Sequence, residues 1–425
     1  MSMATATRKF IPDTGQSPVA TVVVTRLPIL DRTHNLLGYE LLVHGTSNDR
    51  DEGDAESMRI RAHADLMHAF VDLGVERLVG KAEAFMRLPR ASLGAALALP
   101  IAGAHMVIGI DCSSPIDYDT LVELSSLRRK GFRLALEDPP LGDVDPLLLG
   151  AVEMAQYAKF RMSGSLGAAA VQAMRQRGMR VIATQIDTHE QMQRAVAIGC
   201  DGFEGCYLSE PEVVVGSSLR ENKLSVLRLL AAIEDPTKGP VELDAIIRTD
   251  AALSYKVLRC VNSASFSLPL KVRSVLHATV YLGVDRIRSW IRMIAISGLQ
   301  QCPTELLKFA LIRGRMCELL ATKLSNDQRE MAFTVGLFSL LDALLNAPLE
   351  ELLARIPVAE DIREALLRQR GPLATLLDAA KSCERGDWQR LEASSVPTAQ
   401  CAGAYVDAVE WAENVFEVGG DARPA

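Results

Sequence analysis

Cysteine pairs, a surplus of basic residues and a long uninterrupted apolar run are all missing from this sequence of 425 residues. None of the eight cysteines belongs to a C-x-x-C pair, so the sequence argues against a zinc site or a disulfide framework and predicts reduced thiols. The most apolar window, 93–110, is too short and too interrupted to cross a membrane. With no recognisable signal peptide, we expect a cytoplasmic protein without a membrane segment. The net charge of −7 argues against a general nucleic-acid surface.

What is present is the composition of a soluble globular protein, with 48% hydrophobic and 23% charged residues. The length leaves room for two or three domains with full cores. The predicted organisation is a flexible N-terminal tail at 1–17, a strand–helix region at 18–213, a helical region at 214–416 and a C-terminal tail at 417–425.

The strand–helix region begins with two apolar runs, 21–30 and 36–44, around a short polar turn, which predicts an antiparallel hairpin. Short apolar runs then alternate with segments of helical periodicity. The further predicted strands are 84–88, 106–111, 132–137, 157–161, 179–184 and 202–204. The predicted helices are 54–73, 117–130, 143–153, 165–177 and 188–198, and three of them are followed by a glycine suited to a left-handed cap: Gly131, Gly178 and Gly199. The fold class is therefore α/β, a TIM-like (β/α)8 barrel with a reversed first strand.

Glu40 is the most informative residue of this region, because it is a carboxylate inside an apolar strand. Such a charge is costly unless it is paired or binds a metal, so Glu40 is either a metal ligand at the barrel mouth or an ion-paired strand end. In a barrel of this kind, chemistry takes place at the carboxyl ends of the strands. The residues expected there are Glu40, Arg87, Gly109, Glu137, Asp138, Lys159, Thr184 and Asp187.

Residues 18–213 resemble the EAL domain, and the matches follow the order and spacing of that family. Gly-Tyr-Glu40-Leu-Leu stands at the Glu-Ala-Leu signature, and Glu137-Asp138 stands at the Asp-Asp-Phe-Gly motif. Lys159-Phe-Arg161 is similar to Lys-Ile-Asp, and the segment 181–188 is similar to Val-Ile-Ala-Glu-Gly-Val-Glu-Thr. The segment 201–207 resembles the closing Gln-Gly-Tyr segment. The resemblance implies a barrel whose active members hydrolyse cyclic di-GMP with two divalent metals.

The departures from the family pattern affect the implied metal ligands. Arg87 stands where the family has Asn, Gly109 and Thr184 stand where it has Glu, and Asp187 is shorter than the expected Glu. We expect Arg87 to act as an internal counter-charge for Glu40 or Glu137 in place of a metal. His44 takes the place of a phosphate-binding arginine, which makes binding of cyclic di-GMP doubtful. The sequence thus predicts a vestigial site with no catalytic residue, no metal and no cofactor, Mg²⁺ or Mn²⁺ being needed only if the chain is an enzyme.

The second half of the chain reads as consecutive helices separated by proline and glycine. After an apolar stripe from Leu224 to Ile233, the predicted helices are 241–248, 251–261, 274–282, 284–299, 303–324, 328–345, 360–369, 372–385 and 400–416. Residues 215–416 resemble the HDOD domain, a helical relative of HD-type phosphohydrolases, best over 246–264. His277 is the only histidine in this half, and Ser339-Leu340 stand where an HD enzyme has His-Asp. No binuclear metal site is therefore expected.

Two further groups of residues are read as structural. Arg286, Arg288 and Arg292 are expected to form a solvated helix face rather than an anion site. Trp388, Tyr405 and Trp411 are expected to pack the C-terminal helices rather than to form an interaction surface.

Three functions stay open after these observations. The first is a non-enzymatic bacterial signalling protein that acts on protein partners in a network related to cyclic di-GMP, with a homodimer possible. The second is a sensor that binds cyclic di-GMP or another nucleotide without cleaving it. The third is a weak phosphodiesterase that uses Glu40, Glu137, Asp138 and Lys159.

Overall fold

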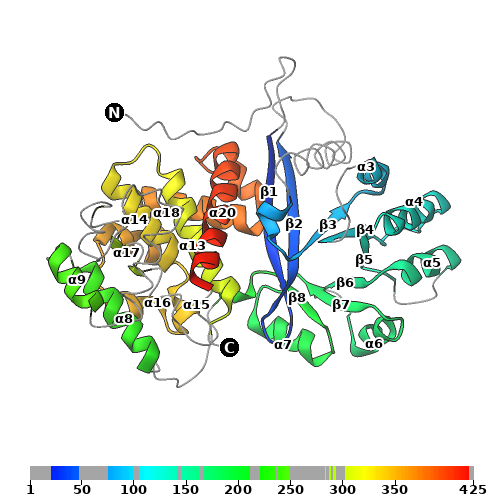
Figure 1. Ribbon diagram of the computed structural model, residues 1–425, viewed down its shortest axis with the longest axis horizontal. Helices are drawn as coiled ribbons and strands as arrows, with labels where there is room; N and C mark the ends of the chain where they lie inside the picture. The colour runs from blue at the N-terminus through cyan, green and yellow to red at the C-terminus, as the bar shows by residue number, and fades with distance from the viewer. Residues whose placement is uncertain are drawn as a thin grey trace, which may run out of the picture.

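The computed structural model describes residues 21–46, 75–98, 105–140, 145–162, 166–210, 221–235, 237–248, 283, 287–288, 291–292 and 302–420. It consists of a closed eight-stranded barrel and a helical domain that lie side by side (Figure 1). The predicted architecture is confirmed: an α/β barrel is followed by an all-α region.

The barrel strands follow one another in chain order around the closed sheet. β1 pairs antiparallel with both β2 and β8, whereas all other neighbours are parallel, so the first strand is reversed as predicted. The strands are β1 Thr21–Leu30, β2 Leu36–Thr46, β3 Glu83–Leu88, β4 Met106–Asp111, β5 Arg133–Glu137, β6 Tyr157–Arg161, β7 Arg180–Thr184 and β8 Gly202–Glu204.

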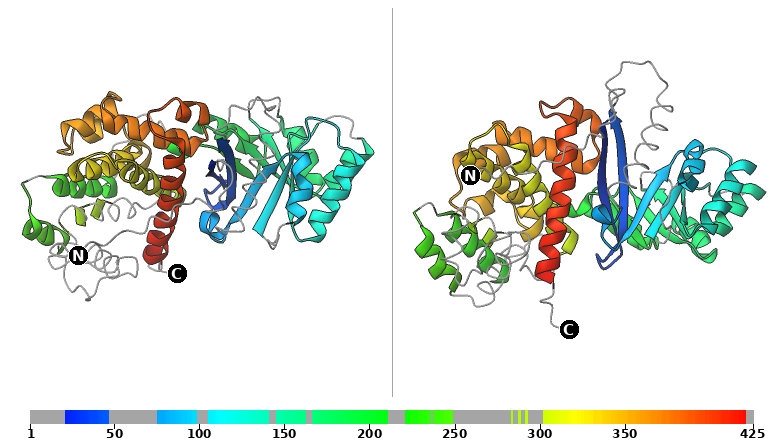
Figure 2. Two further views of the ribbon diagram at one scale, coloured as in Figure 1. Left: turned by 90° about the horizontal axis from the view of Figure 1, so that it is seen from above. Right: turned by 45° about the horizontal axis from the view of Figure 1, so that its top comes forward.

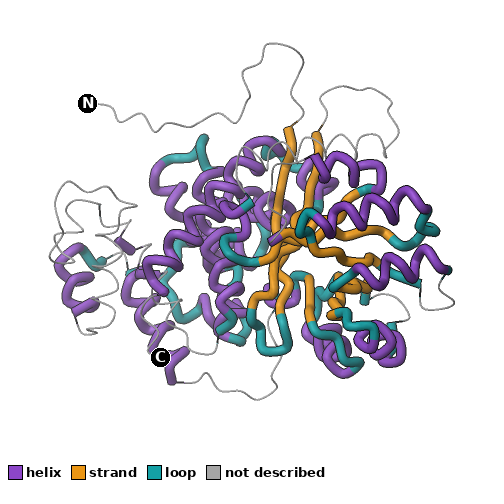
Figure 3. Tube along the Cα trace, turned by 45° about the vertical axis from the view of Figure 1, so that its right-hand side comes forward, coloured by secondary structure: helices purple, strands orange, loops and turns teal. Residues whose placement is uncertain are grey.

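Helices cover the outside of the parallel strands (Figure 3). They are α2 Glu76–Val79, α3 Leu93–Ala98, α4 Tyr118–Arg129, α5 Pro146–Met154, α6 Ala168–Gln176 and α7 His189–Ala197. The sequence sets their ends locally: Thr188 and Gln191 form a capping box at the start of α7, and Asp117 and Asp145 cap α4 and α5. Gly131, Gly178 and Gly199 have φ of +92°, +82° and +98°, which confirms the predicted left-handed caps.

The interior of the barrel holds its own small apolar core, separate from the main one. It consists of Ile29, Phe85, Val107, Ala135, Tyr157 and Ile182. These side chains come from six strands, and they fill the barrel up to its mouth. Side chains alternate along each strand, so the next inward-facing side chains lie two residues further on, where the polar residues Glu137, Lys159 and Thr184 follow Ala135, Tyr157 and Ile182.

The helical domain consists of α8 Glu221–Glu234, α9 Pro240–Arg248, α13 Thr304–Leu320, α14 Asn326–Phe338, α15 Leu341–Leu345, α16 Leu349–Leu353, α17 Glu360–Leu367, α18 Pro372–Arg385, α19 Trp388–Glu392 and α20 Thr398–Gly420. The predicted helix 328–345 breaks at Ser339 and Leu340 into α14 and α15, and α20 continues to Gly420, beyond its predicted end at 416. The short helices α16 and α19 were not predicted. The predicted helices 54–73, 251–261 and 274–282, most of 284–299, and His277 lie outside the described residues.

The arginines predicted to form a solvated helix face are, where described, turned toward α8 and the loop after it. Arg292 is 7% exposed and its Nη2 donates to Oε2 of Glu234 at 3.1 Å. Arg288 donates from Nη2 to the carbonyl oxygen of Lys238 at 2.6 Å. The prediction is wrong for these two residues, because each guanidinium serves as an internal partner. Arg286 lies outside the described residues.

The hairpin of β1 and β2 forms the wall that the barrel shares with the helical domain (Figure 2). Helices α13, α18 and α20 pack on this side, and apolar residues of both parts belong to one continuous core. Tyr405 on α20 is 2% exposed and reaches β1, while Trp411 packs edge-on against Phe333 at 6.1 Å between ring centroids. The predicted packing role of these aromatics is confirmed.

The described part of the chain contains seven of the eight cysteines and most of the predicted helices. All seven cysteines within it are free, and five of them are buried. Among the described helices, none is long and apolar enough to cross a membrane.

Candidate active site

Three buried carboxylates meet at one lysine at the mouth of the barrel. Nζ of Lys159 on β6 lies 2.5 Å from Oε2 of Glu40 and 3.3 Å from Oε1 of Glu137. It also lies 2.8 Å from Oε2 of Glu204 on β8. All four side chains are at most 12% exposed. Glu40 and Glu137 thus lie close together around one cation, and that cation is Lys159.

The charges in this cluster shift one another's protonation. Burial raises the pKa of Glu137 to about 7; Lys159 opposes this shift, whereas Glu40 and Glu204 add to it. Burial also raises the pKa of Glu204. Burial alone would lower the pKa of Lys159, but the three carboxylates raise it well above its usual value, so this lysine stays protonated. The cluster therefore combines a permanent cation with a carboxyl group that titrates near neutrality.

A cavity of about 740 Å³ opens above this cluster. Six of the eight predicted site residues line it: Glu40, Arg87, Glu137, Asp138, Lys159 and Thr184. Gly109 lies beneath it, beside the carboxylate of Glu137. Asp187 is exposed and is not among the lining residues, so its placement in the site is wrong. The chain has already left strand β7 there and is approaching the first turn of α7.

Arg87 does not hold the position expected for it. Its guanidinium pairs with Asp111 at the rim, where the arginine side chain is 53% exposed. Among the described residues, Lys159 is the cation within 4 Å of the carboxylates of Glu40, Glu137 and Glu204. Arg87 still makes a small contribution, since it lowers the pKa of Glu137 from a distance. The prediction that Arg87 is their direct counter-charge is wrong, because lysine already fills that space.

Arg161 is a second rim cation that the sequence did not single out. Its Nε donates to Oδ2 of Asp138 at 2.7 Å, and its backbone N–H donates to Oδ1 at 3.0 Å. Asp138 has φ of +47°, and Gln185, which also lines the cavity, has φ of +60°. Left-handed backbone at residues other than glycine is costly and is concentrated at functional sites.

Glu204 is the main residue that sequence reasoning missed. Its segment was recognised only as a closing motif, yet it carries a carboxylate inside a buried strand, the same signal that singled out Glu40. The pairing of Ile29 with Glu204, where β1 meets β8, closes the barrel and brings this carboxylate to Lys159.

The divalent metals implied by the resemblance do not fit the arrangement of these side chains. Within the part of the chain that the structure describes, no group of three or more His, Cys, Asp or Glu side chains is placed to hold a metal ion. Glu40, Glu137 and Glu204 converge instead on the ammonium of Lys159. We therefore assign no step to a metal.

An ion pair in the helical domain lies beside Ser339, which the resemblance to HD-type enzymes places at a histidine position. Arg313 on α13 donates from Nη2 to Oε2 of Glu384 on α18 at 2.7 Å, and from Nη1 to Oγ of Ser339 at 2.9 Å. Arg313 and Glu384 are each 3% exposed. A buried salt bridge thus lies directly beside Ser339.

Comparison with known proteins assigns the chain to a family. Residues 223–355 match the HDOD domain family. The chain is 31% identical over 379 residues to the cyclic di-GMP phosphodiesterase CdgJ of Vibrio cholerae, an alignment that covers 88% of this chain and 87% of CdgJ. It is 26% identical to the uncharacterised protein YuxH of Bacillus subtilis, over 93% of this chain and 99% of YuxH. The chain belongs to the family of EAL–HDOD proteins related to cyclic di-GMP signalling.

Among solved structures, the barrel is similar to a PaMucR phosphodiesterase in complex with cyclic di-GMP, with 17% identity, a TM-score of 0.37, and coverage of 44% of this chain and 94% of that one. It is also similar to BlrP1 of Klebsiella pneumoniae in a complex with manganese and cyclic di-GMP. The identity there is 18% and the TM-score 0.36, over 44% of this chain and 55% of BlrP1.

The prediction that this chain is not an enzyme is contradicted by the comparison with CdgJ. A protein that aligns with 88% of this chain is named a phosphodiesterase. The prediction rested on the carboxylates that this chain lacks at Gly109 and Thr184. It did not include Glu204, which binds Lys159, or the side chain of Glu137, which occupies the space beside Gly109.

Proposed function

We propose that the barrel binds cyclic di-GMP in the cavity at the carboxyl ends of its strands and hydrolyses one of its phosphodiester bonds. The observation that carries this proposal is the pairing of Glu137, with a pKa of about 7, and Lys159 at the base of a cavity of about 740 Å³. That volume lies within the usual range for small-molecule sites. The likeness to CdgJ over most of the chain supports the choice of substrate.

Each polar group has a role in this reaction. Glu137 takes a proton from the attacking water, since a carboxylate with a pKa near 7 is a stronger base than an ordinary one and about half of these groups are deprotonated at neutral pH. Lys159 stabilises the negative charge that develops on the phosphate oxygens. Arg87 and Arg161, both at the rim, hold the phosphates of the nucleotide by exchanging one carboxylate contact for a phosphate contact. Water is consumed, one P–O bond breaks, and a linear dinucleotide leaves.

The test is an assay of the purified full chain with cyclic di-GMP, with and without Mg²⁺ or Mn²⁺, that follows the linear product by chromatography. We expect turnover in the wild-type protein and a loss of about 10²–10⁴-fold in Glu137→Ala, the usual cost of removing a general base. Asp187→Asn, an exposed residue outside the cavity, is the control and should stay within twofold. Absence of hydrolysis by the wild-type protein under both conditions would refute the proposal.

The affinity of the site is tested separately by calorimetry. Arg161→Ala and Arg87→Ala should each weaken binding of cyclic di-GMP about tenfold or more, because a charge-assisted contact to phosphate is lost. Equal affinity in both variants and the wild type would exclude these arginines as phosphate ligands. Protein partners and a homodimer remain predictions of the sequence.

A further inference from the structure

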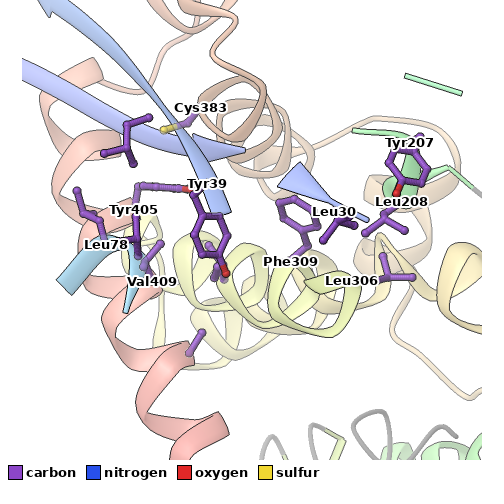
Figure 4. Packing of buried hydrophobic residues seen from close by; sticks show 14 of the residues in the cluster. Leu30, Tyr39, Leu78, Tyr207, Leu208, Leu306, Phe309, Cys383, Tyr405 and Val409 are labelled. Atoms are coloured by element: carbon purple, nitrogen blue, oxygen red, sulfur yellow. The ribbon is translucent and has the colours of Figure 1, made fainter. Parts of the chain in front are cut away.

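Tyr39 and Glu40 are neighbours on β2 and serve two different parts of the molecule. Glu40 faces the cavity and its Oε2 lies 2.5 Å from Nζ of Lys159. Tyr39 is 1% exposed and lies among side chains of the helical domain (Figure 4). The two side chains point to opposite faces of β2 because they are adjacent on the strand. Since one strand carries both, a displacement of β2 would move both residues.

Tyr39 is bound to the helical domain by polar contacts from α13. Its hydroxyl donates to Oε2 of Glu305 at 2.7 Å, and it accepts from Nζ of Lys308 at 3.3 Å. The guanidinium of Arg26, on the neighbouring strand β1, lies 4.1 Å from the centroid of the Tyr39 ring. The ring is thus held on its face by a cation and at its hydroxyl by a hydrogen-bonded ion pair.

Glu413 of α20 completes this cluster. Its Oε1 accepts from Nη2 of Arg26 at 2.6 Å and from Nζ of Lys308 at 3.0 Å. Lys308 also lies 3.2 Å from Oε1 of Glu305, so two cations are balanced by two carboxylates. Loss of one charged member would leave its largely buried partner without a counter-charge. The four side chains therefore depend on one another, and all of them are brought together where α13 and α20 pack on the hairpin.

We propose that Tyr39 is a positioning residue through which the helical domain controls hydrolysis in the barrel. Docking of α13 and α20 fixes β2, and β2 holds Glu40 against Lys159. Misplacement of a site by about 1 Å can cost about 10²-fold in rate, so loosening this contact would strongly affect turnover. The inference rests on the proposed function, and it gives the HDOD half of the chain a regulatory role in the same reaction.

The test compares two buried tyrosines of this domain interface in the full chain. Tyr39→Phe removes the hydroxyl by which β2 contacts Glu305 of α13. Tyr405→Phe is the matched control: its hydroxyl, on α20, accepts from the backbone N–H of Arg26 on β1 at 3.1 Å. Both variants lose one buried hydroxyl at the interface. Only in Tyr39→Phe does this hydroxyl belong to β2, the strand that carries Glu40. Glu305→Ala, which removes the acceptor of the Tyr39 hydroxyl on α13, is the second variant should Tyr39→Phe not fold, and the same loss of kcat is expected of it.

We expect Tyr39→Phe to lower kcat about tenfold or more with KM changed less than twofold, and Tyr405→Phe to leave both within twofold. Equal losses of kcat in the two variants, or no loss in Tyr39→Phe, would overturn the inference. Hydrogen exchange of residues 157–161, measured without nucleotide, gives a readout that does not depend on hydrolysis. Tyr39→Phe should speed exchange on this strand and Tyr405→Phe should not. If the wild-type protein fails to hydrolyse cyclic di-GMP, the proposed function fails, while this comparison still decides the coupling.

Discussion

Gly109 and Glu137 share one space on adjacent strands: a Cβ at residue 109 would lie 2.6 Å from Oε1 of Glu137. The EAL pattern has a glutamate at the first position and an aspartate at the second. In this chain the longer side chain at 137 occupies the space that a side chain at 109 would need. The side chain of Glu137 on β5 thus extends into part of the space where a carboxylate at residue 109 on β4 would lie.

We predict that Gly109→Ala displaces the carboxylate of Glu137 from Lys159 and lowers the rate of hydrolysis about tenfold or more. The backbone of Gly109 is not left-handed, so the effect comes from the contact rather than from strain. Adding Glu137→Asp should restore part of the activity, because the shorter side chain vacates the space. Gly167→Ala, where a new Cβ meets nothing within 4 Å, is the control. Full activity of Gly109→Ala would show that this contact is unimportant.

The stability of the protein should depend on the titration of Glu137. Its pKa is about 7 in the folded protein against an ordinary value of 4.5, so the folded state holds this proton more tightly. The stabilisation is fully present below pH 4.5 and is lost as the pH rises through 7, in total roughly 3 kcal/mol. Urea unfolding from pH 4.5 to 8 should show this decline in the wild type and lack it in Glu137→Gln. Parallel curves for the two proteins would contradict the prediction.

Removal of Lys159 should destabilise the protein mainly at alkaline pH. Lys159→Met leaves three buried carboxylates without their cation, which costs about 3–5 kcal/mol when they are ionised. At pH 5 the loss should be smaller, because burial favours the protonated form of Glu137 and Glu204. The free energy of unfolding at pH 5 and pH 8 measures this. Lys130→Met, at an exposed lysine, should change it by less than about 0.5 kcal/mol at either pH.

The barrel could be predicted closely because its signals are local. The two apolar runs 21–30 and 36–44 around a polar turn, and the glycines that follow three of the helices, are read from neighbouring residues and correspond closely to the observed elements. The position of Lys159 could also be expected, since it is a charged residue within a short apolar strand, Tyr157–Arg161.

What could not be predicted depends on closure and docking. Glu204 reaches Lys159 only because β8 meets β1, which are far apart in the sequence. The contact of Tyr39 with Glu305 spans 266 residues and joins two domains. The prediction for Arg87 is wrong because a long side chain at the end of a strand can point outward as well as inward. The guanidinium of Arg87 points outward and pairs with Asp111 at the rim of the cavity.

The buried ion pair of Arg313 and Glu384 should be structural. Glu384→Ala leaves the guanidinium of Arg313 buried and unpaired and should lower the free energy of unfolding by about 3–5 kcal/mol. Replacing both residues by Met should cost much less, since no buried charge is left behind. Urea unfolding of the two variants gives the comparison. A double variant as unstable as Glu384→Ala would show that the pair contributes beyond the neutralisation of Arg313.

The barrel closes between β8 and β1 through only two residue pairs, Ile29 with Glu204 and Leu30 with Phe203, against ten between β1 and β2. Opening of this junction would cost less than opening of any long strand pair, and it would withdraw Glu204 from Lys159 while the other strands stay joined. The charge around Lys159, and with it the proposed attraction of the site for an anionic nucleotide, therefore depends on one of the two shortest junctions of the barrel, the other being that of β7 with β8.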